Sequence, residues 1–273
     1  MSADDSATDG DEQYHLELSD GDIEGPVLLP GDPDRVEVIA DLWDRSEQVA
    51  DHREYRTLVG EYDGEALAVT STGIGSPSAA IAVEELARIG AESFLRVGSC
   101  GAIQADVDVG DLVITTGAVR QEGTSDEYVR RGYPAAAHDE VVTALVTAAE
   151  RLGHEYHLGV TCSTDSFYAG QSRPGFGGFR TPEADARIEA LRNAGVLNFE
   201  MEASAILTLA GLYGLRAGAV CTVYANRVTG EFRTAGQRKA AETASLAAAL
   251  LSRMDRVKQE AGVDRWHAGL SLP

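Results

Sequence analysis

Lysine is almost absent from the sequence, which carries it only at Lys239 and Lys258 and has arginine at its other basic positions. Its 23 basic residues stand against 44 Asp and Glu residues, so the formal net charge is -21. This charge excludes general binding to nucleic-acid backbones. Because the acidic residues are spread along the chain, we interpret them as a hydrated surface adapted to high salt. An ordinary acidic cytosolic protein is the alternative.

Long apolar runs and paired cysteines are also missing. No stretch approaches the roughly 20 apolar residues that a membrane span needs, and no basic start followed by an apolar run marks a signal peptide. Cys100, Cys162 and Cys221 are scattered without a CxxC pair, which excludes a disulfide framework and a zinc site. We therefore expect a cytoplasmic protein that does not bind membranes and whose cysteines are small buried thiols.

The rest of the sequence has the pattern of one α/β domain. Residues 1–13 are polar, acidic and free of aromatic side chains, and we predict that they are disordered. Residues 14–273 then form a single domain without a linker or repeat. Apolar runs, several of them continuous as in strands covered on both faces, predict strands at 25–30, 66–72, 93–99, 111–119, 157–164 and 217–226.

Helical patterns lie between these runs, at 76–90, 202–214 and 238–260. In the first of them we predict Ser76 as the N-cap and Pro77 as the first helical residue. Alternation of strands and helices predicts an α/β fold with a substantially parallel sheet. Ligands of such folds bind beyond the carboxyl ends of the strands, and the polar clusters of this sequence fall there.

Two of these clusters can bind an anion. In "LLPGDPDRVEVIA" (28–40), Gly31 permits a turn and Arg35 begins a helix, which suits an oxyanion or a plain turn. In "FLRVGSCGAIQ" (94–104), we interpret Arg96 and Ser99 as parts of a glycine turn at the end of a buried strand. A buried guanidinium needs an anion. Either a phosphate or a structural Asp or Glu can supply it.

Two further clusters fit a planar base and a sugar. After the strand at 157–164, an aromatic ring, an amide and a guanidinium can stack on a base and hydrogen-bond to its edge; they are Phe167, Gln171 and Arg173. An ordinary glycine-rich loop is the alternative. In "NFEMEAS" (198–204), Glu200 and Glu202 flank Met201. Their carboxylates can accept hydrogen bonds from sugar hydroxyls, or they interact with a helix dipole.

Together these segments resemble the nucleoside phosphorylases, and most closely those that cleave uridine. The matching motifs cover most of the chain, from His15 to Arg227: "PGDPDRV", "HREY", "STGIGSPS", "AVEELARIG", "FLRVGSCGAIQ", "STDSFYAGQSR", "NFEMEAS" and "ANR". The resemblance implies a single-domain, three-layer α/β/α fold with a mixed, largely parallel sheet. It also implies a pentosyltransferase without an organic cofactor, which converts uridine and phosphate reversibly to uracil and ribose 1-phosphate, and a hexamer built from three dimers.

The resemblance further implies roles for individual residues. The substrate phosphate would be held by Gly31, Arg35, Arg96 and Ser99, and by Arg53 of the neighbouring subunit. The ribose would be held by Met201, Glu202 and the neighbour's His15. The uracil would be held by Phe167, Gln171 and Arg173. A potassium ion at the dimer interface would lie near Glu54, Ile74 and Ser78. Catalysis is assigned to Arg96, Arg173 and Glu202, through electrostatic stabilisation of the transition state.

Two other functions stay open. The motif "RVGSCGA" is more similar to the corresponding motif of the purine-cleaving phosphorylases, which favours guanosine or inosine as substrates. However, "CTVYANRV" lacks the Ser-Asp pair of those enzymes, and the "GQSR" loop favours uracil. A non-catalytic nucleoside-binding protein is the second alternative. The arginine set disfavours it, because a binder of nucleosides alone does not need to hold phosphate.

The charge by itself leads to a prediction about salt. At 0.01 M ionic strength the Debye length is roughly 30 Å, so most carboxylates of the domain repel one another, whereas at 1 M it is about 3 Å. We therefore expect the thermal midpoint of unfolding to rise steeply between dilute buffer and molar potassium chloride. A midpoint that stays flat or falls over this range would contradict the interpretation of the acidic surface as an adaptation to salt.

Overall fold

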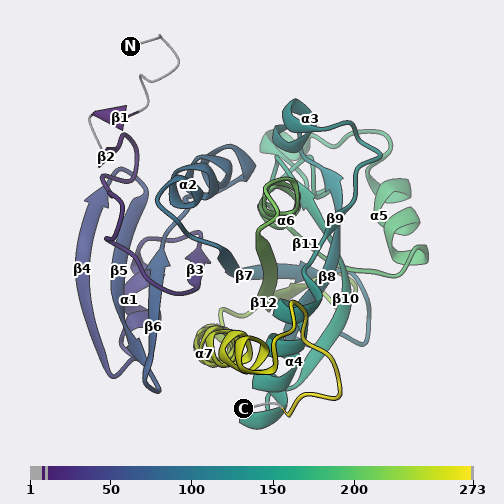
Figure 1. Ribbon diagram of the computed structural model, residues 1–273. Coiled ribbons are helices and arrows are strands. Elements are labelled where there is room, and N and C mark those ends of the chain that lie inside the picture. Colours follow the sequence, from purple (N-terminus) through teal and green to yellow (C-terminus); the bar gives the residue numbers. More distant parts are fainter. Residues whose placement is uncertain (1–7, 10–11, 272–273) are drawn as a thin grey trace.

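The computed structural model describes residues 8–9 and 12–271 of the chain (Figure 1). Within these residues ten strands form one mixed sheet: β3 (Val27–Pro30), β4 (Arg45–His52), β5 (Tyr55–Tyr62), β6 (Glu65–Thr70), β7 (Ser93–Ala102), β8 (Leu112–Gln121), β9 (Ala135–Ala136), β10 (Tyr156–Thr164), β11 (Val196–Glu200) and β12 (Arg216–Asn226). Their order is β11-β10-β8-β12-β7-β3-β6-β5-β4, and β9 pairs with β8. Because β11 pairs with both β10 and β7, this end of the sheet closes on itself.

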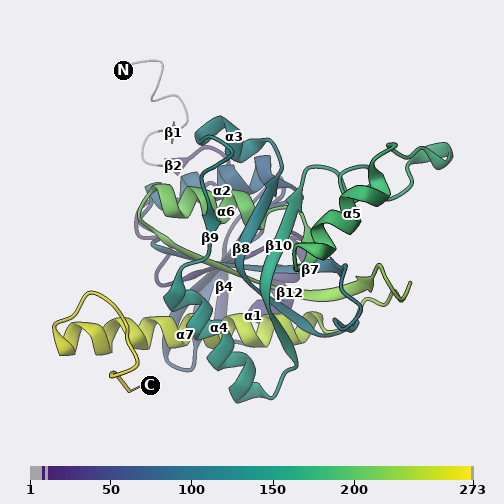
Figure 2. The ribbon, with the colours of Figure 1, turned by 90° about the vertical axis from the view of Figure 1, so that its right-hand side faces the viewer.

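Helices cover both faces of the sheet, as Figures 1 and 2 show. One face carries α1 (Asp34–Ala40), α4 (Asp139–Leu152) and α7 (Gln237–Ala261). The other face carries α2 (Ser76–Arg88) and α6 (Ala203–Leu212), with α3 (Thr124–Tyr128) against α6. The remaining helix, α5 (Ala184–Asn193), contacts β11. The expected α/β fold with three layers is confirmed.

Alternating side chains of the central strands supply the two cores. In β7, Phe94 packs in the core under α2 and α6, whereas Leu95 packs in the core against α1, α4 and α7. In β3, Val27 and Leu29 face the first of these cores and Leu28 faces the second. Successive side chains of a strand point to opposite faces. A strand covered on both faces is therefore apolar throughout, which is the pattern by which these strands were predicted.

All six predicted strands and all three predicted helices are present. The elements that were not predicted are β1 (Thr8–Asp9), β2 (Glu12–Gln13), β4, β5, β9 and β11 and the helices α3, α4 and α5. Strand β4 lies at the edge of the sheet, and Ala50 is its one buried residue. Its sequence therefore contains no apolar run.

Cys100, Cys162 and Cys221 are buried free thiols, as expected. Within residues 12–271 no helix combines the length and apolar character needed to cross a bilayer.

Two local predictions differ from the structure. Of the segment expected to be disordered, residues 1–7 and 10–11 lie outside the described residues. The short strands β1 (Thr8–Asp9) and β2 (Glu12–Gln13) pair in an antiparallel ladder, and Gln13 is buried. At the start of α2 the N-cap is Gly75, and Ser76 is already helical. The Ser76 hydroxyl does not cap the helix, because it donates to the carbonyl of Met201 at 2.8 Å.

Candidate functional site

The stretch around Arg96 is part of a strand. We expected a glycine turn here, but β7 continues to Ala102, and neither Gly98 nor Gly101 has a positive φ. A Cβ at Gly98 would lie 2.7 Å from the Cys221 sulfur and 2.9 Å from Nη2 of Arg96. The glycine therefore leaves space for the guanidinium beside the strand. The prediction of a turn was wrong, because glycine occurs both where the backbone bends and where a side chain needs space beside a strand.

The anions that Arg96 contacts in the protein are two glutamates at the junction of β11 and α6. Its Nε donates to Oε2 of Glu200 at 2.7 Å, and its Nη2 pairs with Oε2 of Glu202. All three side chains are buried. The structural-carboxylate alternative for Arg96 is thus present in the fold. The two glutamates leave part of the guanidinium unpaired, because the buried Nη1 of Arg96 has no hydrogen-bond partner within the described residues.

Glu200 is occupied entirely by the protein. Its Oε2 also accepts hydrogen bonds from the backbone N–H groups of Glu202 at 2.8 Å and Ala203 at 2.9 Å. Its Oε1 accepts from the hydroxyl of Ser163 at the end of β10. Glu200 therefore orients Arg96 and the start of α6. The role of Ser163 could not be predicted from the sequence, because it is set by the pairing of β10 with β11.

Two carboxylates share one guanidinium in this triad, and these surroundings shift the pKa values of Glu202 and Arg96. Burial raises the pKa of Glu202; the charge of Arg96 opposes this shift and the charge of Glu200 adds to it. Burial would lower the pKa of Arg96, but the two glutamates outweigh it and the net shift is upward. Arg96 therefore stays charged, and burial makes Glu202 take up a proton more readily than an exposed glutamate does.

Arg35 approaches the same part of β7 from the other side. Its Nη2 lies 3.4 Å from the Ser99 hydroxyl and 3.5 Å from the hydroxyl of Tyr224 on β12, and its guanidinium lies 5.6 Å from the Tyr224 ring centroid. Burial raises the pKa of Cys221 to about 12, and the charges of both Arg96 and Arg35 act against that shift. The two guanidiniums therefore flank one thiol near the carboxyl end of the sheet.

The loops after β3 and β6 complete this end of the site. A Cβ at Gly31 would lie 3.1 Å from the carbonyl oxygen of Gly73, so the two loops touch. The N–H of Gly75 donates to Oε1 of Glu202 at 2.5 Å. Both oxygens of Glu202 are thus engaged, and Met201 is tied to α2 through its carbonyl. The structure brings Gly31, Met201 and Glu202 together around two neighbouring loops.

The three residues predicted to hold a base also form one cluster. Arg173 stacks over Phe167 with 4.4 Å between guanidinium and ring centroid, and its Nε lies 3.5 Å from Oε1 of Gln171. A Cβ at Gly101 would lie 3.2 Å from Nη2 of Arg173, so this cluster meets β7 just beyond Ser99. Burial lowers the pKa of Arg173, and within the described residues no carboxylate pairs with it.

A further arginine of this cluster had no role assigned from the sequence. Arg227 follows β12, and its Nη1 donates to the carbonyl of Gln171 at 2.7 Å while Nη2 lies 3.4 Å from the carbonyl of Ser172. The "ANR" motif was the only sign of it. Burial lowers the pKa of Arg227, and the charges of Arg173 and Arg180 add to that shift. The guanidinium of Arg227 therefore holds the loop at Gln171 and Ser172, and Arg173 and Arg180 add further positive charge near it.

Two predicted residues lie apart from the rest. Arg53 donates to the Tyr14 hydroxyl at 3.4 Å and lies over its ring, and His15 packs edge-on against the same ring. His15 is held by Glu85, which lies nine residues along α2 from Ser76, or about 14 Å at 1.5 Å per residue. Within the described residues, no contact joins His15 or Arg53 to Arg96 or Arg173.

The residues predicted to bind potassium lie close together. A Cβ at Gly73 would be 2.8 Å from Cγ of Glu54 and 3.2 Å from Oγ of Ser78, and Oγ of Ser78 lies 3.4 Å from the carbonyl oxygen of Ile74. Oxygen ligands of this kind suit a hard cation. Across residues 12–271, no group of three or more His, Cys, Asp or Glu side chains could hold a metal ion.

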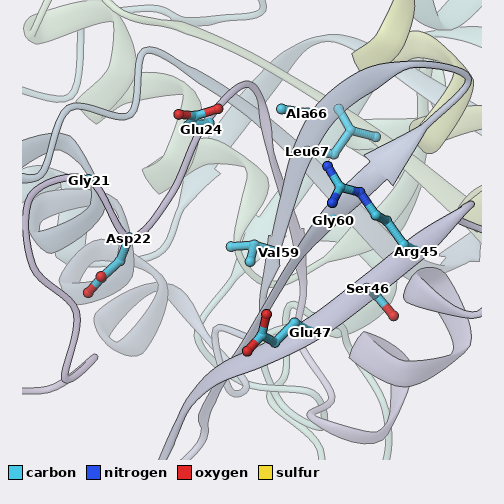
Figure 3. Close-up of a pocket in the computed structure, with 10 residues that line it drawn as sticks. All are labelled: Gly21, Asp22, Glu24, Arg45, Ser46, Glu47, Val59, Gly60, Ala66 and Leu67. Carbon is cyan, nitrogen blue, oxygen red and sulfur yellow. The ribbon is translucent and has the colours of Figure 1, made fainter.

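A separate pocket lies beside the edge of the sheet, between residues 21–24 and strands β4 to β6 (Figure 3). It is lined by Gly21, Asp22, Glu24, Arg45, Ser46, Glu47, Val59, Gly60, Ala66 and Leu67. None of the predicted site residues lines it. The chemistry indicated by the sequence is therefore gathered at the carboxyl ends of the strands and not in this pocket.

Comparisons with known proteins show the family to which the chain belongs. The family model for the phosphorylase superfamily matches residues 27–252. A uridine phosphorylase of Thermococcus kodakarensis is 54% identical over 270 residues, covering 99% of this chain and 98% of the relative. A guanosine phosphorylase of Halorubrum lacusprofundi is 48% identical, covering 80% and 85%. A uridine phosphorylase of Escherichia coli K12 is 45% identical, covering 84% and 92%.

The raised pKa of Glu202 predicts the effect of a neutral isostere on stability. When a carboxyl pKa is higher in the folded state, the folded protein binds the proton more tightly, so the ionised form lowers stability above that pKa. We expect the thermal midpoint of Glu202→Gln, measured relative to the wild type, to become more favourable from low pH to about pH 8, because only the wild-type carboxyl ionises over this range. The exposed Glu189→Gln is the control and should show no such trend. A difference between the Glu202→Gln and wild-type midpoints that does not change with pH would contradict this.

Proposed function

The chain belongs to the phosphorylase superfamily, and we propose that it is a uridine phosphorylase that converts uridine and phosphate to uracil and ribose 1-phosphate. Uridine phosphorylases between 41% and 54% identical to this chain support the substrate. In the reaction a phosphate oxygen bonds to C1′ of the ribose while the C1′–N1 bond breaks. The bonding electron pair leaves with uracil, which then takes up a proton.

The unpaired Nη1 of Arg96 is the observation that carries the proposal. Arg96 is 4% exposed, and a buried donor of a charged group without a partner costs about 1–3 kcal/mol or more. An anionic substrate would remove that cost. Three residues further along β7, the Ser99 hydroxyl lies 3.4 Å from Nη2 of Arg35, which offers a hydroxyl and a second guanidinium. A phosphate between them would accept charge-assisted hydrogen bonds, and Gly31 would let its loop come close.

Cleavage of the glycosidic bond places positive charge on the ribose and negative charge on the base. The phosphate beside C1′ stabilises the first, and Arg173 and Gln171, donating to the uracil carbonyls, stabilise the second. Arg173 can do so because its charge is not neutralised by a carboxylate in the described part of the chain. Phe167 supplies an aromatic surface for the uracil ring. Each oxygen of Glu202 accepts from one protein donor, Arg96 or Gly75, and has a second lone pair that would accept from ribose hydroxyls next to Met201.

Cleavage of a purine nucleoside is the second candidate function. The guanosine phosphorylase that is 48% identical to this chain favours it, although a smaller share of both chains is covered than for the relative at 54%. Strand β12 ends in Tyr224, Ala225 and Asn226, without an acidic side chain that could protonate a purine ring. This composition supports uridine as the better substrate.

We further propose that the active enzyme is a homo-oligomer, a hexamer of three dimers, in which His15 and Arg53 serve the neighbouring subunit. Their separation from Arg96 and their common contact with Tyr14 support this assignment. Full activity in a monomer would contradict it.

A potassium ion held by Glu54, Ile74 and Ser78 is part of the same proposal. A thermal midpoint that does not change with potassium at constant ionic strength would contradict that ion.

We also place the enzyme in the cytoplasm, where three buried free cysteines stay reduced. Secretion of the active enzyme into the medium would contradict this. High internal salt would suit its acidic surface.

The first test of the function is its dependence on phosphate. We expect uridine to be cleaved only when phosphate is present, with ribose 1-phosphate accumulating in step with uracil. The physical reason is that the arginines around β7 stabilise an anionic nucleophile and not water. Equal rates of uracil release in phosphate-free buffer would indicate a hydrolase.

The second test concerns the base. Arg173→Leu removes a charge-assisted contact worth about 1.5–3 kcal/mol, so kcat/KM for uridine should fall by about one to two decades at roughly 1.4 kcal/mol per tenfold. The KM for phosphate should change little. If guanosine is the better substrate of the parent enzyme and Arg173→Leu leaves its turnover intact, the purine function is the correct one.

A further inference from the structure

Glu85 has no role in the proposed reaction, and its carboxylate contacts the His15 imidazole and the backbone N–H groups of His15 and Leu16. Its Oε1 lies 2.6 Å from Nδ1 of the imidazole. Its Oε2 accepts from the backbone N–H groups of His15 at 3.0 Å and Leu16 at 2.9 Å. The side chain of Glu85 is 4% exposed, whereas that of His15 is 26% exposed. A carboxylate inside α2 thus fixes both the backbone and the ring of a residue that reaches the surface.

The rest of the surroundings fix the plane of the ring. Tyr14 packs edge-on with 4.9 Å between ring centroids, and the buried Tyr55 lies at 6.4 Å, also edge-on. The carbonyl of His15 contacts Nδ1 of His52 at 3.1 Å. No hydrogen bond to Nε2 of His15 occurs within residues 12–271, and the residue lines a groove together with side chains of α2 and α3. The ring is therefore held at one nitrogen while the other is free.

The contacts of Glu85 decide which nitrogen of a neutral His15 carries the proton. Since Oε2 faces two N–H donors, the carboxylate acts there as an acceptor, and an ionised carboxylate can only accept at Oε1 as well. Nδ1 must then be the donor to Oε1. In a neutral imidazole the other nitrogen, Nε2, is consequently an acceptor.

We propose that Glu85 is a positioning residue that keeps the His15 proton on Nδ1, so that Nε2 selects nucleosides whose 5′ substituent donates a hydrogen bond. The inference rests on the proposed function, in which His15 meets the ribose 5′ position. It assigns a specificity to that contact: a 5′-hydroxyl is favoured because it donates to Nε2, and a 5′-deoxy sugar, which has no donor, is disfavoured.

The test is Glu85→Gln, which keeps the shape of the side chain. With its carbonyl oxygen towards the two backbone N–H groups, the amide presents NH2 to Nδ1 and no longer favours the proton there. The quantity to measure is the ratio of kcat/KM for uridine to that for 5′-O-methyluridine, whose 5′ oxygen can accept a hydrogen bond but cannot donate one. We expect the ratio to fall by about threefold to tenfold, the effect of one hydrogen bond, because a protonated Nε2 can donate to either 5′ oxygen.

Two controls separate positioning from general damage. Glu84→Gln makes the same chemical change one residue earlier on α2, where the carboxylate accepts from Tyr213 instead of His15, and should leave the ratio unchanged. In a His15→Ala background, Glu85→Gln should have no further effect on the ratio. Equal losses for both nucleosides in Glu85→Gln would overturn the proposal, because they would show that Glu85 only supports the fold.

A second measurement does not depend on activity. The imidazole 15N chemical shifts of His15 at neutral pH report which nitrogen is protonated. We expect the proton on Nδ1 in the wild type and a shift towards Nε2 in Glu85→Gln. A wild-type proton on Nε2 would overturn the role of Glu85. Failure to cleave uridine with phosphate would instead contradict the proposed function, and the 15N shifts would still decide the assignment to Glu85.

Discussion

A guanidinium buried in the middle of a sheet must have anions around it, and Arg96 has Glu200 and Glu202. This triad ties β7 to the junction of β11 and α6, and through Gly75 to the start of α2. Three parts of the chain, namely the start of α2, strand β7 and the β11–α6 junction, therefore meet at one charge cluster. Burying three ionised groups stabilises a fold only weakly, and replacing such groups by apolar ones is often neutral. The triad is better explained by what it positions than by the stability it adds.

The same triad leaves charge in places where a phosphorolysis needs it. Glu200 uses all its oxygens on the protein, so its part is to orient Arg96, whereas Arg96 keeps one donor unpaired. At the far end of β7, Arg173 is a cation without a carboxylate partner among the described residues. One strand thus connects a position suited to an incoming anion with a position suited to a leaving anion. Glycines 98 and 101 allow both guanidiniums to lie against it.

Much of this could be predicted from the sequence, and the exceptions have physical reasons. Strands buried on both faces gave continuous apolar runs, and the polar residues after them marked the site. Edge strand β4 gave no such run, because its side chains face solvent. Gly98 was assigned to a turn because a glycine that makes room for a side chain looks the same in sequence as one that bends the backbone. Ser163, Arg227 and Glu85 gave little or no signal, since each acts on a residue distant along the chain.

By itself the sequence determined the layered α/β class, the acidic surface, and the residue types that can bind phosphate, sugar and base. These follow from composition and from periodicity within single segments, together with a resemblance carried by short motifs. Only the tertiary structure decided that Glu200 and Glu202 both pair with Arg96, that Arg173 lies against β7, and that His15 is held by Glu85. Charges and hydrogen bonds act over a few ångströms in space, and the distance between two residues in space is set by strand order and helix packing, not by their separation along the chain.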